Sequence, residues 1–301
     1  MFYSRWFRLK VLVIGGLGFI GSNLCKRLLK KNHDVICIDN LGTGKKENVM
    51  DFMFDPRFHL DFHDIVEPFS PANVDVIIHC AIASQKDLLH FMKTCTYGIF
   101  NAAGMARRNK ARLIYLSSYA YYGTYNGSQI NEDASSINIG NAICSGIQAA
   151  EYILRNYNLD IRILRVFDAY GKKMPNDCLL YNIIRKVRKG HDVEVNNTND
   201  LVSLCHVKDI LDAICCTMEI DKFKGPLNIG ADSYTTVENI FNVVKKICDS
   251  KSKLINKSDR SIFMNPVPNT NKAKDVLKWN QKIDFEWGIK DIIEYMDSRE
   301  L

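Results

Sequence analysis

The chain has 301 residues, of which 47% are hydrophobic and 25% charged, and its formal net charge at pH 7 is +6. This composition is typical of a globular protein and excludes a disordered or collagen-like chain. The basic residues are scattered rather than interleaved with aromatic residues, so the positive charge predicts no nucleic-acid partner.

Ten cysteines are present, and no two of them form a Cys-x-x-Cys pair. Cys25, Cys37, Cys80 and Cys95 fall within apolar segments, a pattern typical of reduced core thiols, and no zinc-ligand spacing occurs. The basic and aromatic N-terminal stretch is too short to span a bilayer and has no cleavage pattern. We therefore expect a cytoplasmic protein with no metal ion and no membrane contact.

Short apolar runs alternate with segments of helical periodicity through the first half of the chain. The expected strands cover residues 9–15, 34–39, 57–60, 75–81, 112–118 and 161–167, and the expected helices cover residues 18–31, 86–108 and 142–157. Continuous apolar strands separated by helices predict a parallel sheet that is covered on both faces. With right-handed crossovers, this is an α/β fold with a doubly wound parallel sheet, the Rossmann arrangement.

The pattern changes after residue 170. Helices are expected over 178–190, 206–219, 236–249 and 285–297, short strands near 193–195 and 226–229, and a loop over 250–271. We predict a Rossmann domain over residues 1–171, with its sheet completed by later segments near 193–229. Residues 172–301 are expected to form mostly a smaller C-terminal lobe.

The stretch VLVIGGLGFIGSNL carries glycines at positions 15, 16, 18 and 21, between an apolar strand and a helix. Such a turn brings backbone N–H groups and a helix N-terminus close to a pyrophosphate. Asp39 ends the next strand, where a carboxylate accepts hydrogen bonds from ribose hydroxyls and repels a 2′-phosphate. The pattern predicts a dinucleotide site that prefers NAD to NADP. Lys45 and Lys46 follow Asp39 and are expected to face solvent.

Further segments with recognisable patterns follow in order along nearly the whole chain. They are GGLGFIG (15–21), DNLGTGKKENV (39–49), HDIVEP (63–68), IIHCA (77–81), LSSYAYYG (116–123), RVFDAYG (165–171), HVKDI (206–210), LNIG (227–230) and KAKDVLKW (272–279). In order and spacing the chain resembles the extended short-chain dehydrogenases/reductases, the NAD-dependent epimerases and dehydratases that modify nucleotide-linked sugars. The stretch from residue 39 to 68 is most similar to the UDP-glucuronate decarboxylase and 4,6-dehydratase branch.

The resemblance implies NAD as the cofactor, a nucleotide sugar as the substrate and the C-terminal lobe as the substrate-binding part. It also implies which residues hold each part of NAD. Gly15, Gly18, Phe19, Ile20 and Gly21 would form the pyrophosphate turn, Asp39 and Asn40 would hold the adenosine ribose, Asp64 and Ile65 would flank the adenine, and Ala81, Ser117 and Val166 would line the nicotinamide side.

A homodimer is a further implication of the resemblance, because family members pair two helices of each subunit. The corresponding helices here are those over 86–108 and 142–157. Their small and apolar residues suit close packing, either between subunits or on the sheet, and these are Ala102, Ala103, Ala149, Ala150 and Ile153.

The family's reaction uses a Tyr-x-x-x-Lys pair and a nearby Ser or Thr, which move a hydroxyl proton while a sugar carbon, usually C4, exchanges a hydride with NAD. Ser118 stands at the Ser/Thr position. The helix that should carry the pair ends its motif with AAE (149–151), and counting back places Ile147 at the lysine position and Ile143 at the tyrosine position. The resemblance thus implies Ser118 as the retained catalytic residue, and Ile143 and Ile147 as not catalytic.

Other positions on the substrate side also depart from the family pattern. Cys95 and Asp168 replace two asparagines, Ala120 replaces the glutamate of dehydratases and decarboxylases, and Val202 replaces an arginine that grips the substrate phosphate. These departures predict an intact coenzyme site beside altered substrate chemistry. Multi-step dehydration or decarboxylation needs more groups than remain, so a single redox step is favoured.

Three functions stay open at this point. The first is an NAD-dependent oxidoreductase acting on a nucleotide sugar with an atypical proton route, through Ser118, a water, or one of Tyr119, Tyr122, Cys144 and His79. Each of these last four side chains also has a purely structural explanation. The second is a non-catalytic NAD-binding regulatory subunit, and the third is an epimerase or dehydratase with other acid–base residues.

Overall fold

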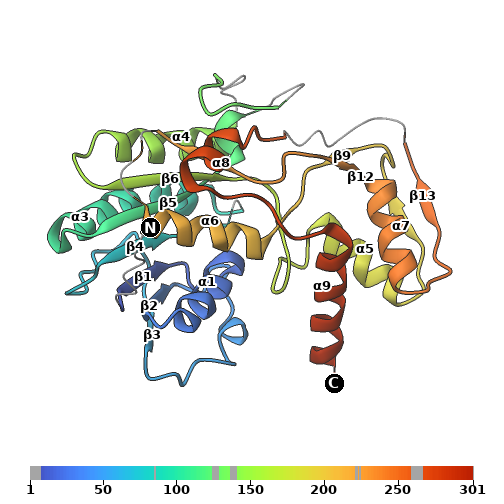
Figure 1. The fold of residues 1–301 in the computed structure, drawn as a ribbon, viewed down its shortest axis with the longest axis horizontal. Coiled ribbons are helices and arrows are strands. Elements are labelled where there is room, and N and C mark those ends of the chain that lie inside the picture. Colours follow the sequence, from blue (N-terminus) through green and yellow to red (C-terminus); the bar gives the residue numbers. More distant parts are fainter. Residues whose placement is uncertain are drawn as a thin grey trace. The chain divides into compact units, whose positions relative to one another are not determined.

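The computed structural model describes residues 8–84, 86–123, 129–135, 141–220, 223, 225–258 and 267–300. Two compact units divide the chain (Figure 1). The first comprises Met1–Tyr121, Asn138–Leu164 and Ile214–Pro226, and the second comprises Tyr122–Ile137, Arg165–Ala213 and Leu227–Leu301. Each unit is therefore assembled from segments that are distant in sequence.

A seven-stranded sheet is found within the described residues, with the strand order β11-β6-β5-β4-β1-β2-β3. Its strands are β1 (Lys10–Ile14), β2 (Asp34–Asp39), β3 (Phe58–Phe62), β4 (Val76–His79), β5 (Arg112–Ser118), β6 (Ile161–Val166) and β11 (Leu227–Ile229). The neighbours from β5 to β3 pair in parallel. The chain first winds outward from β1 to β3 and then from β4 to β6 on the other side, which confirms the predicted α/β doubly wound fold.

The first strand shows why this sequence forms a covered parallel sheet. All four residues from Val11 to Ile14 are at most 1% exposed, so both faces of β1 are packed. Leu12 and Ile14 share a core cluster with residues of α3 (Ile99–Asn109) and α4 (Ala142–Arg155). Helix α1 (Phe19–Lys30) contacts β1 and β2 and buries Leu24 and Leu28.

The predicted strands and helices of the first half are confirmed with one exception. The helix expected over 86–108 is interrupted, because α2 (Leu88–Lys93) passes through a π-helical turn, Thr94–Gly98, before α3 begins. Thr94 and Thr96 donate their hydroxyls to backbone carbonyls one turn earlier, at 3.0 and 2.8 Å. This type of back-bonding distorts helices, and hydrophobic periodicity does not reveal it.

The second unit is mainly helical. It contains α5 (Leu179–Arg188), α7 (Val237–Ile247), α8 (Asn271–Leu277), α9 (Phe285–Glu300) and the first half of α6 (Val207–Glu219). Its two-stranded pairs are β7 (Ala169–Tyr170) with β10 (Cys205–His206), β9 (Leu201–Val202) with β12 (Thr235–Thr236), and β8 (Val193–Val195) with β13 (Leu254–Asn256).

Helices α5, α6, α7 and α9 and strands β8 and β11 were all predicted in this region, but the loop over 250–271 is partly wrong. Strand β13 lies inside it and pairs in parallel with β8, and residues 259–266 lie outside the described part of the chain. A three-residue strand is too short to show an alternating pattern.

All ten cysteines are free thiols, and Cys25, Cys37 and Cys95 are buried.

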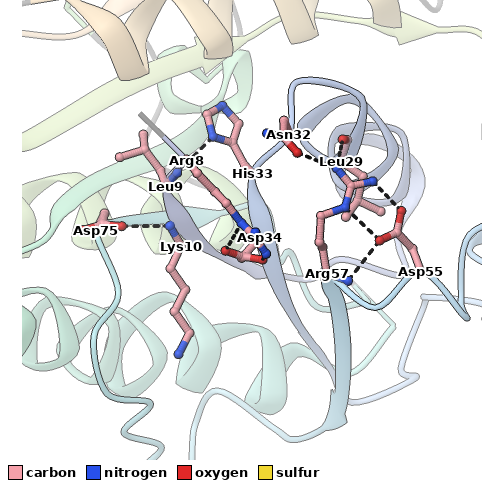
Figure 2. Close-up of polar contacts among 10 residues, drawn as sticks. All are labelled: Arg8, Leu9, Lys10, Leu29, Asn32, His33, Asp34, Asp55, Arg57 and Asp75. Atoms are coloured by element: carbon pink, nitrogen blue, oxygen red, sulfur yellow. Dashed lines mark hydrogen bonds and ion pairs between the residues drawn. The ribbon is translucent and has the colours of Figure 1, made fainter. Parts of the chain in front are cut away.

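Polar contacts join the amino ends of the strands, at the edge of the sheet opposite to the glycine turn (Figure 2). Arg8 forms a bidentate ion pair with Asp34 at the start of β2, with 2.7 Å between Nε and Oδ2. Arg57, just before β3, donates to the carbonyl of Leu29 at 3.0 Å and to Oδ1 of Asn32 at 3.1 Å, beyond the end of α1. The Arg8 pair thus connects the segment before β1 to the start of β2, and the Arg57 contacts connect the end of α1 to the start of β3.

A stability prediction concerns Asp209 in α6, whose side chain is 1% exposed. Its Oδ1 and Oδ2 accept the backbone N–H groups of Lys282 and Ile283 at 3.1 and 3.0 Å. We expect Asp209→Ala to lower the free energy of unfolding by about 2–4 kcal/mol, since two donors lose their acceptor. Urea unfolding of Asp209→Ala beside Asp275→Ala, an exposed aspartate of α8, measures this; equal effects of the two changes would contradict it.

Candidate coenzyme and active site

The glycine turn between β1 and α1 is set by close backbone contacts. Gly15 has φ +78°, and a Cβ at that position would lie 2.7 Å from Cα of Ala81. A Cβ at Gly21 would overlap the carbonyl of Gly15 and lie 2.9 Å from Cα of Gly16. Gly18 is the N-cap of α1 and makes no side-chain cap. The turn thus forms a cradle that only glycines leave open, at a helix N-terminus that favours a pyrophosphate.

Asp39 at the end of β2 joins this turn to the loop that follows it. Its Oδ2 accepts the N–H of Leu17 at 3.0 Å, and its Oδ1 accepts the N–H of Leu41 at 2.8 Å. Burial raises the pKa of the Asp39 carboxyl, and the two backbone donors oppose that rise. Each carboxylate oxygen has a further lone pair, which suits it to accept a ribose hydroxyl.

The two lysines beyond Asp39 are exposed, as predicted. The Lys46 ammonium lies 4.5 Å from the centre of the Phe62 ring, and the Lys45 backbone N–H donates to the carbonyl of Leu17. The charge next to the ribose position is therefore the carboxylate of Asp39, which agrees with a preference for NAD over NADP.

The loop after β3 brings the predicted adenine residues to the same edge of the sheet. Asn40 Nδ2 donates to Asp64 Oδ2 at 2.8 Å, and Ile65 is 5% exposed. His90 of α2 is the third side chain of this polar group, with Nε2 3.4 Å from Asp64 Oδ2. His90 was not predicted from the sequence, because fifty residues and two strands separate it from Asn40.

At the predicted nicotinamide end, Ala81 packs against Gly15, and Ser117 and Ser118 close strand β5. Ser117 is 2% exposed and donates its hydroxyl to Glu151 Oε1 at 2.6 Å, so it supports the strand end through α4. Ser118 is half-buried, and its Oγ accepts the N–H of Ala120 at 3.2 Å. Val166 is 8% exposed at the end of β6 and belongs to the second unit, whereas the other predicted site residues belong to the first.

Helix α4 presents an apolar face where the family resemblance places its proton pair. The helix runs without interruption over Ala142–Arg155, so positions 143 and 147 lie on one face. Ile147 is 1% exposed within the core cluster, and Ile143 packs against that cluster. Cys95 joins the same cluster, and burial raises the pKa of its thiol to about 12. A Cβ at Gly146 would lie 3.3 Å from Cys95 Sγ, so α4 packs closely on the π-helical turn.

Two candidate proton carriers are structural groups. Tyr122 is fully buried; its hydroxyl donates to Asn228 at 2.6 Å and accepts from Arg165 at 2.8 Å, and burial raises its pKa to about 12. His79 is 1% exposed at the end of β4, its ring meets Tyr115 edge-on, and burial lowers its pKa to about 4. At neutral pH, Tyr122 is a phenol held in a hydrogen-bond network and His79 is a neutral core residue.

The remaining candidates lie around the short 3-10 turn Tyr119–Tyr122. Cys144 is 1% exposed, and its Sγ lies 3.5 Å from the carbonyl of Tyr121. Gln148 donates to the same carbonyl at 3.0 Å. These two α4 side chains anchor the turn, and Ser118, which directly precedes it, is half-buried.

Two searches of the described part of the chain concern other kinds of site. No group of three His, Cys, Asp or Glu side chains gathers there in a way that would hold a metal ion. Among the helices described, none combines the length and the apolar character needed to cross a membrane.

Comparison with known proteins now defines the class. Residues 11–230 match the model of the NAD dependent epimerase/dehydratase family, so the chain belongs to that family. It is 30% identical to UDP-glucuronic acid decarboxylase 1 of Arabidopsis thaliana, over 97% of this chain and 71% of that protein. It is also 30% identical to UDP-glucuronic acid decarboxylase 6 of the same plant, over 95% of this chain and 89% of that protein.

Solved structures share the fold at lower identity. The UDP-glucose 4-epimerase of Thermotoga maritima, in complex with UDP-glucose, superposes with a TM-score of 0.87 at 22% identity and covers 97% of this chain and 100% of its own. The UDP-glucuronic acid 4-epimerase of Bacillus cereus, in complex with NAD, gives 0.85 at 20% identity, covering 96% of this chain and 99% of its own.

The glycine cradle generates a prediction about coenzyme affinity. Gly21→Ala places a Cβ against the carbonyl of Gly15, so the turn must open and its N–H groups lose their alignment. We expect NAD affinity, measured by calorimetry, to fall at least about tenfold, the loss of one good hydrogen bond to a charged group. Gly104→Ala in α3 is the matched control, since a Cβ there meets only Arg108 Nη1 at 3.4 Å. Equal NAD affinity in both variants would refute the cradle.

Proposed function

We propose that the chain is an NAD-dependent oxidoreductase that exchanges a hydride with a ring carbon, C4, of a nucleotide-activated sugar, by a proton route without the family's Tyr and Lys. Its 30% identical relatives are decarboxylases of UDP-glucuronic acid, which supports an enzyme of this class. The proposal depends on a contrast between two parts of the first unit. The glycine turn and Asp39 have the arrangement that a dinucleotide site needs, whereas Ile147, at the position of the family's lysine, is 1% exposed in an apolar core.

The coenzyme site assigned here uses the residues already described. The glycines at 15, 18 and 21, with the N–H groups of Phe19 and Ile20, hold the pyrophosphate, and Asp39 with Asn40 holds the adenosine ribose. Asp64 and Ile65 flank the adenine, and Ala81, Ser117 and Val166 line the nicotinamide side. NAD, when bound, supplies the hydride acceptor. The second unit is proposed to contribute the substrate-binding lobe.

Ser118 is the group proposed to handle the proton. A hydroxyl both donates and accepts, and the N–H of Ala120 already occupies one lone pair of Ser118 Oγ at 3.2 Å. Its O–H and second lone pair are therefore the groups that orient a sugar hydroxyl or a water. Loss of a general base costs about 10²–10⁴-fold, and positioning still contributes, so a slow single redox step survives where multi-step chemistry does not.

Two alternatives belong to other classes. A non-catalytic NAD-binding regulatory subunit is favoured by the close packing of Cys95, Gly146 and Ile147, which closes the α4 face as a core. An epimerase or dehydratase with other acid–base residues agrees equally with the relatives, but it needs more proton-transfer groups around Ser118.

Turnover decides between these functions. The purified protein is mixed with NAD or NADH and a panel of UDP- and dTDP-sugars, and absorbance follows the coenzyme while chromatography follows the sugar. We expect slow coenzyme turnover with one sugar class and at least a tenfold loss in Ser118→Ala, because one proton-transfer group then disappears. Tyr122→Phe, a change in the buried network, is the control and should retain the rate of the unmodified chain per folded molecule.

The substitution pair Ile143→Tyr with Ile147→Lys completes this experiment. It should raise the rate if the substrate site is otherwise complete. NAD binding without turnover on any sugar, in both the natural chain and this double variant, would instead establish the non-catalytic alternative.

We also propose a homodimer through the outer surfaces of α3 and α4. The subunit contact cannot involve Ala102, Ala103 and Ala150, because these residues are fully buried in the core cluster with strand residues. Exposed aromatic residues occur instead: Tyr97 is 62%, Phe100 49% and Tyr152 72% exposed.

Light scattering tests the assembly. Phe100→Lys combined with Tyr152→Lys should convert a dimer into a monomer, because two buried charges replace apolar contact area. Phe54→Lys removes a 90% exposed aromatic residue outside these helices and should leave the mass unchanged. A monomer before any substitution would contradict the proposal.

A further inference from the structure

The order of the strands in the first unit determines along which line a bound dinucleotide would lie at the carboxyl ends of β1, β2 and β3. The sheet order places β2 between β1 and β3, and each strand is followed at its carboxyl end by a polar or glycine-rich segment. The glycine turn follows β1, Asp39 and Asn40 end and follow β2, and Asp64 lies just beyond β3. A dinucleotide with its pyrophosphate on the glycine turn and its ribose on Asp39 therefore extends its base toward Asp64.

The side chains at this outer corner have fixed orientations. Asn40 Oδ1 accepts the N–H of Gly42 at 2.9 Å, so its Nδ2 is directed to Asp64 Oδ2, 2.8 Å away. Asp64 Oδ1 accepts the N–H of Val66 at 3.0 Å. The carboxylate is thus bonded on two sides, and the Asp64 side chain is 28% exposed, so it remains accessible from solvent.

His90 approaches this pair from a different element. It lies in the first turn of α2, where its backbone N–H donates to the N-cap residue Asp87 at 3.0 Å. Its Nε2 lies 3.4 Å from Asn40 Nδ2 and 3.4 Å from Asp64 Oδ2, and its side chain is 29% exposed. Asn40 and His90, which are fifty residues apart in sequence, therefore both lie beside the carboxylate of Asp64.

The chemistry of the three groups limits what they recognise. A carboxylate only accepts hydrogen bonds, and a single imidazole nitrogen either donates one bond or accepts one. With Nε2 as an acceptor, His90 engages the second amide hydrogen of Asn40 and positions Asp64 only through Asn40, while Asp64 Oδ2 retains a lone pair for an outside donor. The exocyclic amino group of adenine is such a donor, whereas the 6-oxo group of hypoxanthine is an acceptor that the carboxylate repels.

We propose that His90 is a specificity-determining positioning residue: by holding Asn40, and through Asn40 the carboxylate of Asp64, it makes the base end of the site select a 6-aminopurine over a 6-oxopurine dinucleotide. This inference rests on the proposed NAD site and adds to it a residue from α2. His90 acts through Asn40, so its removal weakens the recognition of the amino group by Asp64 and leaves intact the contacts that the glycine turn and Asp39 make.

Calorimetric titration with NAD and with its deamino analogue, nicotinamide hypoxanthine dinucleotide, measures this selectivity. We expect the natural chain to bind NAD at least about tenfold more tightly than the analogue, the value of one hydrogen bond to a charged acceptor. His90→Ala should reduce that ratio at least threefold through weaker NAD binding, with little change for the analogue. His90→Gln, which can place an amide oxygen near Asn40, should keep most of the selectivity.

Two controls complete the design. Asp64→Asn should abolish the selectivity, and His191→Ala, an exposed histidine of the second unit, should leave the affinities for both dinucleotides unchanged. An unchanged ratio in His90→Ala, or equal affinities of the natural chain for the two dinucleotides, overturns the role of His90 while the NAD site stands. Failure of the natural chain to bind either dinucleotide overturns the proposed function together with this inference.

Discussion

The buried carboxylate of Asp39 is the contact on which the coenzyme edge depends. It bonds the N–H of Leu17 in the glycine turn and the N–H of Leu41 in the next loop, at 3.0 and 2.8 Å. Gly44 approaches so closely that a Cβ there would lie 2.6 Å from Oδ1. One charged side chain therefore orients the loops after β1 and β2 together. The carboxylate that holds these two loops together is also the group proposed to accept hydrogen bonds from the ribose. Coenzyme binding and the conformation of the loops would therefore depend on the same side chain.

From this point the site extends outward through short polar contacts. His63 N donates to the carbonyl of Asp39 at 3.1 Å, which links the end of β2 to the segment after β3. The pair of Asn40 and Asp64 continues that link, and His90 joins α2 to it. Helix α2 in turn leads through the π-helical turn to Cys95, which packs against α4. A continuous series of contacts in the first unit thus connects the predicted adenine end to helix α4.

The sequence predicted most of the fold because the signals were local. Strand β1 is a continuous apolar run, and the glycines and Asp39 stand at fixed distances from it, so the sequence predicted the fold class and indicated where a dinucleotide would bind. The π-helical turn and the three-residue strand β13 were missed, because side-chain back-bonding and very short pairings leave no periodic pattern. His90 was missed for another reason: its partners come from other segments, and only the tertiary fold brings them together. For Tyr122 and His79 the sequence left both a proton-transfer role and a structural role open, and their burial supports the structural one.

The two halves of the site differ in how strongly the fold constrains them. The coenzyme edge is made of backbone contacts, such as Gly15 against Ala81, in which almost any side chain would collide. The proton pair of the family needs only two side chains on one face of a helix, and here that face carries Ile143 and Ile147. Aliphatic residues fill that position without a buried charge and without an unsatisfied polar atom, so the helix gains apolar packing with Cys95 and the sheet. The glycine turn is thus constrained by main-chain contacts, whereas positions 143 and 147 are constrained only by the packing of their side chains.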